Sequence, residues 1–380
     1  MNYCLKCNLP DTFPNISFDE GLCVFCRSNV EKPKIKKDTL GVDKLLDILN
    51  IKNAGTYDCI VPLSGGKDSS YILFYVVRHL KLKPLAVFFD NGFASSYAKD
   101  NVKNLCSKLN VELEISKISP YRLKMIQEAW FVNKYWESGH FGFCGNCENN
   151  IRTLAINTAL KYNIKYILWG STDYENSSDN FKDIEKPTFR NSFGVSGNPL
   201  KGVSKYMRFV YRILFLTRCS IIQKIKILYH YNKYLFYYVR DNLYLRAPAG
   251  IGIFNPYLEV SFIREKPKTI YFYEYINYDP EHQIKVLSEQ ADWKAPTGRA
   301  LKMDCKLHTI GNYFHYRVKG VTDTGFKLSV LVRNNLLARS EAILREENEK
   351  QYIGEVFGSI GGKKAMDKIW EILSSNEYLV

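Results

Sequence analysis

The sequence predicts an α/β protein with a doubly wound, mostly parallel sheet, a small cysteine-rich module before it and a helical region after it. Three observations predict this architecture. Short apolar segments alternate with segments of helical periodicity between residues 40 and 198, a rhythm typical of parallel sheets covered by helices on both faces. A glycine loop separates the first apolar segment from a long helical pattern. Two CxxC pairs precede this region.

The predicted elements of the sheet follow one another in a regular order. Four segments have the length and the apolar content of buried strands: 58–63, 85–89, 111–115 and 166–170. Helical patterns lie before the first strand and between successive strands, at 41–49, 70–79, 97–109 and 151–162. Because helices separate the strands along the chain, we expect neighbouring strands to be parallel.

Length and composition suggest about two domains in an ordinary globular protein. The 380 residues are 46% hydrophobic and 24% charged. Four regions are expected: a cysteine-rich module at 1–30, an α/β domain at 40–198, a basic aromatic helical insertion at 199–246, and a C-terminal region at 247–380. Residues 1–26 lack the apolar core of a secretory signal, so we expect a cytoplasmic protein.

The glycine loop is the sharpest signal in the sequence. Its six residues are Ser64, Gly65, Gly66, Lys67, Asp68 and Ser69. Glycines allow the backbone to approach a phosphate, and the N-terminus of the following helix adds positive potential. Lysine neutralises charge, the serine hydroxyls donate hydrogen bonds, and the aspartate either meets Mg²⁺ or caps the helix. The strand–loop–helix context favours a nucleotide site over a simple glycine turn.

Three further residues are expected beside this loop, at the carboxyl ends of strands. Asp90 follows the second strand, where it either holds the adenosine or caps the next helix. Trp169 and Gly170 end the fourth strand and would line the same edge, although an aromatic residue there also suits the core.

The first four cysteines have the spacing of a structural metal site. Cys4 and Cys7 form one CxxC pair, and Cys23 and Cys26 form a second. Two such pairs suit tetrahedral thiolate coordination of Zn²⁺. A zinc ion would stabilise a module that is too short for a core of its own.

A second cysteine group is predicted from Cys144, Cys147 and Cys305. The first two form a CxxC pair, and Cys305 lies between Asp304 and Lys306, a polar context. Three thiolates with an open position would suit an iron–sulfur cluster with one exchangeable iron or a second zinc. The CxxC pair alone could instead be redox-active.

Taken together, these motifs resemble those of known enzymes. The loop resembles the SGGxDS signature of PP-loop ATPases, which have an adenine nucleotide alpha hydrolase-like fold and cleave ATP to AMP and pyrophosphate. In combination and order, the motifs are similar to those of the N-acetyl sugar amidotransferases of bacterial lipopolysaccharide, O-antigen and flagellin-glycan biosynthesis. The segments that carry this resemblance are 4–10, 18–23, 57–69, 144–147, 169–170, 303–306 and 339–342.

The resemblance implies that ATP and Mg²⁺ activate the acetamido group of a nucleotide- or lipid-linked N-acetyl sugar, and that ammonia converts it to an acetamidino group. Lys67, Asp68 and Ser69 would be catalytic, and the rest of the loop with Asp90, Trp169 and Gly170 would bind the nucleotide. Ammonia is expected from a separate glutaminase with a cyclase-like subunit.

The segment 201–246 is not explained by the resemblance. It carries ten basic residues and one acidic residue, which is most of the chain's net charge of +14. It is expected to contact an acidic partner, the anionic surface of the inner membrane, or RNA, or to be an ordinary insertion with a solvated basic face.

Two other functions fit parts of the sequence. A tRNA 2-thiolation enzyme of the PP-loop superfamily would share the zinc site, the loop and the second cysteine group, and the positive charge favours tRNA as its partner. A scaffold or nucleotide sensor without turnover would also keep the fold, but the intact loop at residues 64–69 disfavours it.

Overall fold

The computed structural model of the chain describes fourteen stretches of residues, and all structural statements concern these. They are 2–13, 16–27, 39–49, 56–116, 121–122, 124–125, 128, 144–171, 206–207, 210–216, 220–241, 267–294, 304–335 and 337–357. The stretches 28–38, 172–205 and 242–266 lie outside them.

A five-stranded parallel sheet forms the centre of the fold, in the order β5-β4-β3-β6-β7. Its strands are β3 (Cys59–Leu63), β4 (Pro84–Phe89), β5 (Leu113–Ser116), β6 (Tyr166–Trp169) and β7 (Lys268–Tyr271). The chain starts at the middle strand, runs outward through β4 and β5, and returns to the other side of β3. This doubly wound parallel topology confirms the predicted fold class.

Helices cover both faces of the sheet because the strand side chains alternate between them. On one face, Val61, Phe88 and Leu168 pack against the helices α2, α3, α4 and α11. On the other face, Ile60 and Val87 pack against α6. The bounds of these helices are Val42–Leu49, Lys67–Arg78, Ser96–Leu109, Pro280–Gln290 and, for α6, Cys144–Lys161.

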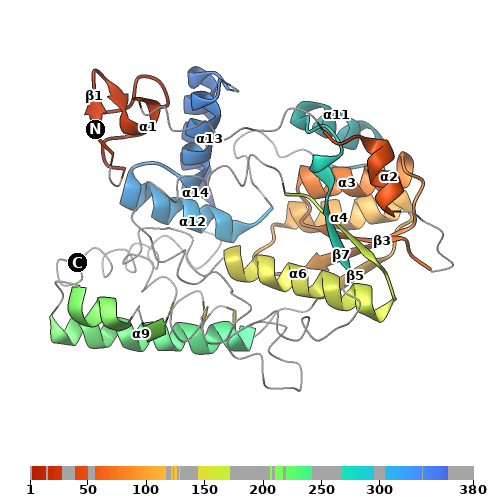
Figure 1. Cartoon of the computed structure of the whole chain (residues 1–380), viewed down its shortest axis with the longest axis horizontal. Helices are drawn as coiled ribbons and strands as arrows, with labels where there is room; N and C mark the ends of the chain where they lie inside the picture. The colour runs from red at the N-terminus through yellow and green to blue at the C-terminus, as the bar shows by residue number, and fades with distance from the viewer. Residues whose placement is uncertain are drawn as a thin grey trace.

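The described part of the chain after residue 303 contains three helices (Figure 1). They are α12 (Lys306–Lys319), α13 (Asp323–Arg333) and α14 (Arg339–Phe357). Buried polar contacts join them: Asn312 on α12 donates to Glu349 on α14 over 2.7 Å, and the Thr322 amide donates to Glu346 over 2.9 Å. The predicted helical character of this region is therefore confirmed.

The N-terminal module packs against these C-terminal helices rather than against the sheet. It consists of a two-stranded antiparallel sheet, β1 (Phe18–Asp19) and β2 (Leu22–Cys23), and the short helix α1 (Val24–Arg27). The Phe13 ring stacks on Phe326 of α13 with centroids 5.2 Å apart. In Figure 1 the module and α13 lie next to each other, so the two ends of the described chain form one lobe.

The predicted insertion contains one long helix, α9 (Ile221–Asp241), preceded by a short π-helical turn, η4 (Arg212–Leu216). A 3-10 turn, η7 (Phe272–Glu274), follows β7. None of the described helices is long and apolar enough to cross a membrane.

Candidate functional site

The loop of residues 64–69 connects β3 to α3 at the carboxyl edge of the sheet. Gly65 has a φ of +83°, and a Cβ atom on it would lie 2.3 Å from the main-chain oxygen of Ala98. Any other residue would therefore be strained in conformation and would clash with α4. Glycine is required here because the loop packs directly on a helix backbone.

Two side chains from distant segments fix the position of this loop. The Trp293 indole donates to the Gly65 carbonyl over 3.1 Å, and the Asn101 amide donates to the same oxygen over 3.3 Å. Asn101 also bonds the main chain of Lys294, so α4 and the segment after α11 are joined at this point. These contacts order the loop before any ligand binds, so that binding would not have to supply the free energy for ordering it.

The amides at the start of α3 are directed toward this loop. The residue that precedes the helix, Gly66, makes no side-chain cap, and its N–H donates to the Ser64 hydroxyl over 3.2 Å. The Ser69 hydroxyl accepts the Ser64 amide over 3.1 Å. A helix N-terminus without a side-chain cap is an anion-binding position, because its first N–H groups have no partner within the helix.

Charged and phenolic groups surround the first turn of α3. The Lys67 ammonium contacts the Asp68 carboxylate at 2.6 Å and the Tyr278 hydroxyl at 2.8 Å. The Tyr273 hydroxyl donates to the Asp68 carbonyl over 2.9 Å, and burial raises the pKa of this tyrosine, so that it stays protonated. Lys67 can exchange the Asp68 carboxylate for an incoming phosphate, which would leave Asp68 available for a cation.

The loop after β6 lies beside the loop after β3. A Cβ atom on Gly170 would be 2.9 Å from Ile72 and 3.9 Å from the Ser69 amide. These two strands are neighbours on opposite sides of the point where the winding direction reverses, which is where open α/β sheets bind ligands. The guanidinium carbon of Arg152 lies over the Trp169 side chain, 4.2 Å from the centroid of the indole ring.

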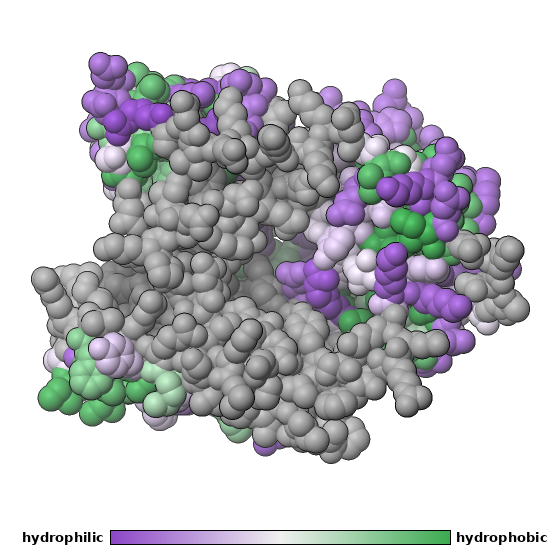
Figure 2. Space-filling view, viewed as in Figure 1, coloured by the Kyte–Doolittle hydropathy of each residue, from purple (hydrophilic) through white to green (hydrophobic). Residues whose placement is uncertain are grey.

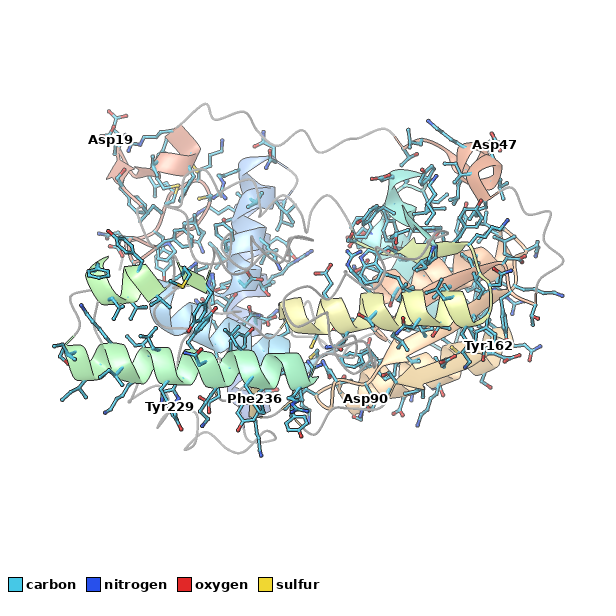
Figure 3. The ribbon with its side chains drawn as sticks, turned by 60° about the horizontal axis from the view of Figure 1, so that its bottom comes forward. Asp19, Asp47, Asp90, Tyr162, Tyr229 and Phe236 are labelled. Carbon is cyan, nitrogen blue, oxygen red and sulfur yellow. The ribbon has the colours of Figure 1, made fainter. Side chains whose placement is uncertain are left out.

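Asp90 follows β4 at the same edge (Figure 3). One of its carboxylate oxygens accepts the Gly92 amide over 3.0 Å, and the other contacts the Lys99 ammonium at 2.6 Å. This carboxylate is therefore held by local partners in the structure. A ribose hydroxyl could bond it from the solvent side, because about a fifth of the side chain (22%) is exposed.

An antiparallel bridge brings the C-terminal region to this edge. Ala94 pairs with Cys305, the Ser95 amide donates to the Asp304 carbonyl, and the Lys306 amide donates to the Phe93 carbonyl. As a result, the Asp304 carboxylate lies 3.4 Å from the Cβ position of Gly66. Asp304 is thus a second carboxylate beside the glycine loop, together with Asp68.

The bridge also places Cys305 near Cys147. The buried Asn91 amide lies 3.1 Å from the Cys305 sulfur and 3.7 Å from the Cys147 sulfur. The Arg122 guanidinium, itself buried, lies 2.8 Å from the Cys147 sulfur. Cys144 begins α6 one turn before Cys147, but its side chain lies outside the described part of the structure.

The four N-terminal cysteines form one cluster. All four sulfur atoms lie within 4.8 Å of one another, and two pairs, Cys4 with Cys26 and Cys7 with Cys23, are 3.6 Å apart. Tetrahedral coordination with zinc–sulfur distances of about 2.3 Å requires sulfur–sulfur distances of roughly 3.8 Å. The cluster could therefore hold a single metal ion of this size.

The surroundings of this cluster favour a thiolate at Cys7, whereas hydrogen bonding with the Cys23 and Cys7 thiols and burial raise the pKa of Cys26. The Cys4 sulfur accepts the amides of Cys7 and Cys23 over 3.5 and 3.3 Å. Hydrogen bonds from the Cys23 and Cys26 thiols, together with the charge of Arg333, lower the pKa of the Cys7 thiol to about 2. Arg333 belongs to α13 and contacts the Cys7 sulfur at 3.3 Å, so the C-terminal lobe also supports the thiolate form.

Several residues at the site were not predicted from the sequence. Asn91 had a local signal, since it directly follows Asp90 at a strand end. Asp304 was noted only as the neighbour of Cys305. Tyr278 and Trp293 reach the loop from more than 200 residues away, and no local pattern marks them.

The fold and the site define an α/β protein with a glycine loop at the carboxyl edge of a parallel sheet and a separate four-cysteine cluster. No family model matches the chain. A stretch of 98 residues is 36% identical to the uncharacterized protein MJ1599 of Methanocaldococcus jannaschii, and the match spans 25% of this chain and 34% of that protein. The chain thus covers about a third of the length of this relative.

Two solved structures are similar to the chain. One is an NH3-dependent NAD synthetase from Campylobacter jejuni, with a TM-score of 0.26 and 14% identity over 53% of this chain and 95% of the other. The second is the U34-tRNA thiolase NcsA from Methanococcus maripaludis with its 4Fe-4S cluster. Its TM-score is 0.29, with 14% identity over 78% of this chain and 71% of the other. At such low values neither similarity assigns a function to this chain.

The close packing of Gly65 on α4 gives a first prediction. Gly65→Ala should destabilise the fold by about 1–3 kcal/mol and weaken ATP binding, because it combines a positive φ with a main-chain clash. Thermal unfolding and calorimetric titration with ATP would measure the two effects. The matched control is Gly354→Ala on α14, where a Cβ atom meets no neighbour within 4 Å. Equal behaviour of the two variants would contradict the proposed role of Gly65.

The cysteine cluster gives a second prediction. Cys4→Ser should remove one equivalent of bound zinc and destabilise the N-terminal module, because structural zinc contributes on the order of 10 kcal/mol to small modules. Elemental analysis of the purified protein would measure the loss. Cys106→Ser, at a buried cysteine outside the cluster, should keep the zinc. Full zinc content in the Cys4→Ser protein would show that the cluster is not the metal site.

Proposed function

We propose that the chain is an ATP-dependent amidotransferase that adenylates the acetamido carbonyl of an N-acetyl sugar and replaces its oxygen with nitrogen. One observation carries the nucleotide part of this proposal. The loop of residues 64–69 lies at the carboxyl end of the middle strand β3 and leads into the uncapped N-terminus of α3. This is where a parallel α/β sheet binds phosphate groups.

The reaction follows from the poor leaving ability of an amide oxygen. The carbonyl oxygen attacks the α-phosphorus of ATP, and pyrophosphate leaves. Ammonia then adds to the activated carbon, AMP leaves with the original carbonyl oxygen, and loss of a proton gives the acetamidino group. Each bond formed is matched by one broken, and no oxidation takes place.

The described residues can divide this work among them. The loop amides and Lys67 would stabilise the departing pyrophosphate and the charge on the reacting phosphorus. Asp68 and Asp304 supply the oxygen ligands that Mg²⁺ prefers, and the ion would neutralise phosphate charge. Asp90 would bond the ribose. The four N-terminal cysteines would hold Zn²⁺, whose contribution there is structural.

The sugar substrate is proposed from the combination of sequence motifs that resemble the N-acetyl sugar amidotransferases. The same resemblance supports a separate glutaminase with a cyclase-like subunit as the source of ammonia. It also supports a role in making bacterial lipopolysaccharide, O-antigen or flagellin glycans.

A tRNA 2-thiolation enzyme is the second candidate, and the pair of Cys147 and Cys305 favours it. Both sulfurs lie beside Asn91, which follows β4 and Asp90 in the chain. Cysteines at the carboxyl edge of the sheet are suited to an iron–sulfur cluster or to zinc, either of which could present sulfur to an activated uridine carbonyl.

An activity assay distinguishes the two candidates. The purified protein, kept anaerobic, should convert a nucleotide-linked acetamido sugar in the presence of ATP, Mg²⁺ and ammonium, with one AMP formed per sugar. Mass spectrometry would detect the replacement of O by NH. Lys67→Ala should lower the rate by at least about a hundredfold, while Lys103→Ala, at an exposed lysine on α4, should keep it.

The opposite result has a clear form. If no acetamido sugar of a panel is converted and AMP forms only when tRNA is added, the amidotransferase proposal is wrong and the thiolation enzyme is favoured.

A further inference from the structure

The outer face of α9 and the adjoining turn η4 expose a group of large apolar side chains, which we call the α9 face. Its members are Tyr211, Leu214, Phe215, Ile221, Ile222, Ile225, Tyr229 and Phe236. We propose that the α9 face binds the surface of an anionic lipid bilayer and holds the enzyme there as a peripheral protein. This inference does not depend on which substrate the enzyme uses.

The exposure of these side chains is unusually high. Ile221 is 77% exposed, Ile222 is 68% exposed and Phe215 is 69% exposed. A single exposed apolar residue is ordinary, but a contiguous group marks an interaction surface. Figure 2 shows a hydrophobic area at the lower left, where Figure 1 places η4 and the first turns of α9.

The apolar residues of α9 follow helical spacing. Ile222, Ile225, Tyr229 and Phe236 are three, four and seven residues apart, so they lie on one stripe of the helix. Tyr229 and Phe236 project from the same side of α9 in Figure 3. Asn232 and Lys233 interrupt this stripe, and the Lys233 ammonium lies 5.2 Å from the centroid of the Tyr229 ring.

The opposite face of α9 is fixed to the body of the protein. Ile227, Tyr231 and Tyr234 are buried. His230 and Lys233 each contact the carboxylate of Glu128 at 2.7 Å. Because these contacts set the rotation of the helix, the α9 face cannot turn inward without breaking them. The exposed apolar side chains are therefore a stable feature of the surface.

The charges around the α9 face match an anionic partner. The segment 201–246 carries ten basic residues and one acidic residue. Among the described ones, Lys226 and Arg240 are exposed beside the apolar stripe. Lysine and arginine next to an apolar stripe are typical of helices that lie in a membrane interface, where they contact anionic headgroups while the apolar side chains enter the acyl region.

The apolar members favour lipid over the other polyanions. Nucleic-acid surfaces use basic side chains and aromatic stacking, and three adjacent isoleucines serve neither purpose. An acidic protein would satisfy the charges but would need an apolar groove of matching shape as well. A bilayer supplies both anionic headgroups and hydrocarbon. Since no described helix can span it, the contact would be peripheral.

Vesicle flotation with the full-length protein tests this proposal. The protein should float with vesicles of phosphatidylcholine that contain phosphatidylglycerol, and far less with phosphatidylcholine alone. Ile222→Ser combined with Ile225→Ser should weaken binding by at least about tenfold, because it removes two inserted side chains. High salt should weaken the wild-type binding too.

A matched control keeps the test specific. Leu46→Ser combined with Leu344→Ser changes two exposed leucines away from the α9 face and should leave flotation unchanged. Both double variants should keep the wild-type melting temperature. The proposal is overturned if the wild-type protein binds neither kind of vesicle, or if the isoleucine variant floats as well as the wild type. It is also overturned if polyuridylate RNA displaces the protein from vesicles and the isoleucine changes do not alter RNA binding.

Discussion

The antiparallel bridge between Ala94 and Cys305 is the interaction on which the candidate site depends. It joins the carboxyl edge of the sheet to the start of α12, and through α12 to the whole C-terminal lobe. The same contact places the Asp304 carboxylate next to Gly66 and the Cys305 sulfur next to Asn91, which is 214 residues earlier in the chain. A single main-chain pairing therefore brings the glycine loop, a second carboxylate and a cysteine pair together at one edge.

The N-terminal module belongs to this arrangement because it packs against the C-terminal helices. Phe13 stacks on Phe326, Thr12 donates to the Lys319 carbonyl over 3.0 Å, and Arg333 contacts the Cys7 sulfur. Metal binding at the four cysteines would thus stabilise the lobe that supplies Asp304 and Cys305. Such stabilisation would link the four-cysteine module to the glycine loop, which the module does not touch through any described contact.

The sequence predicted the inner part of the fold and missed contacts between distant segments. The strands at 58–63, 85–89 and 166–170 correspond within one residue to β3, β4 and β6, since buried parallel strands are short apolar runs. The strand β7 was missed because its four residues, Lys268–Tyr271, carry no such run and pair with β6 about a hundred residues earlier. The glycine loop could be predicted because its chemistry is local. Tyr278 and Trp293 could not, since only folding brings them there.

In the proposed reaction the glycine loop presents the α-phosphorus of ATP to a substrate carbonyl oxygen. An acetamido sugar with oxygen-18 in the carbonyl group tests this step when the label is followed by mass spectrometry during conversion. The heavy oxygen should appear in AMP, since the carbonyl oxygen forms the bond to phosphorus and leaves with it. Label that stays in the sugar, or that appears in pyrophosphate or orthophosphate, would contradict adenylation of the carbonyl.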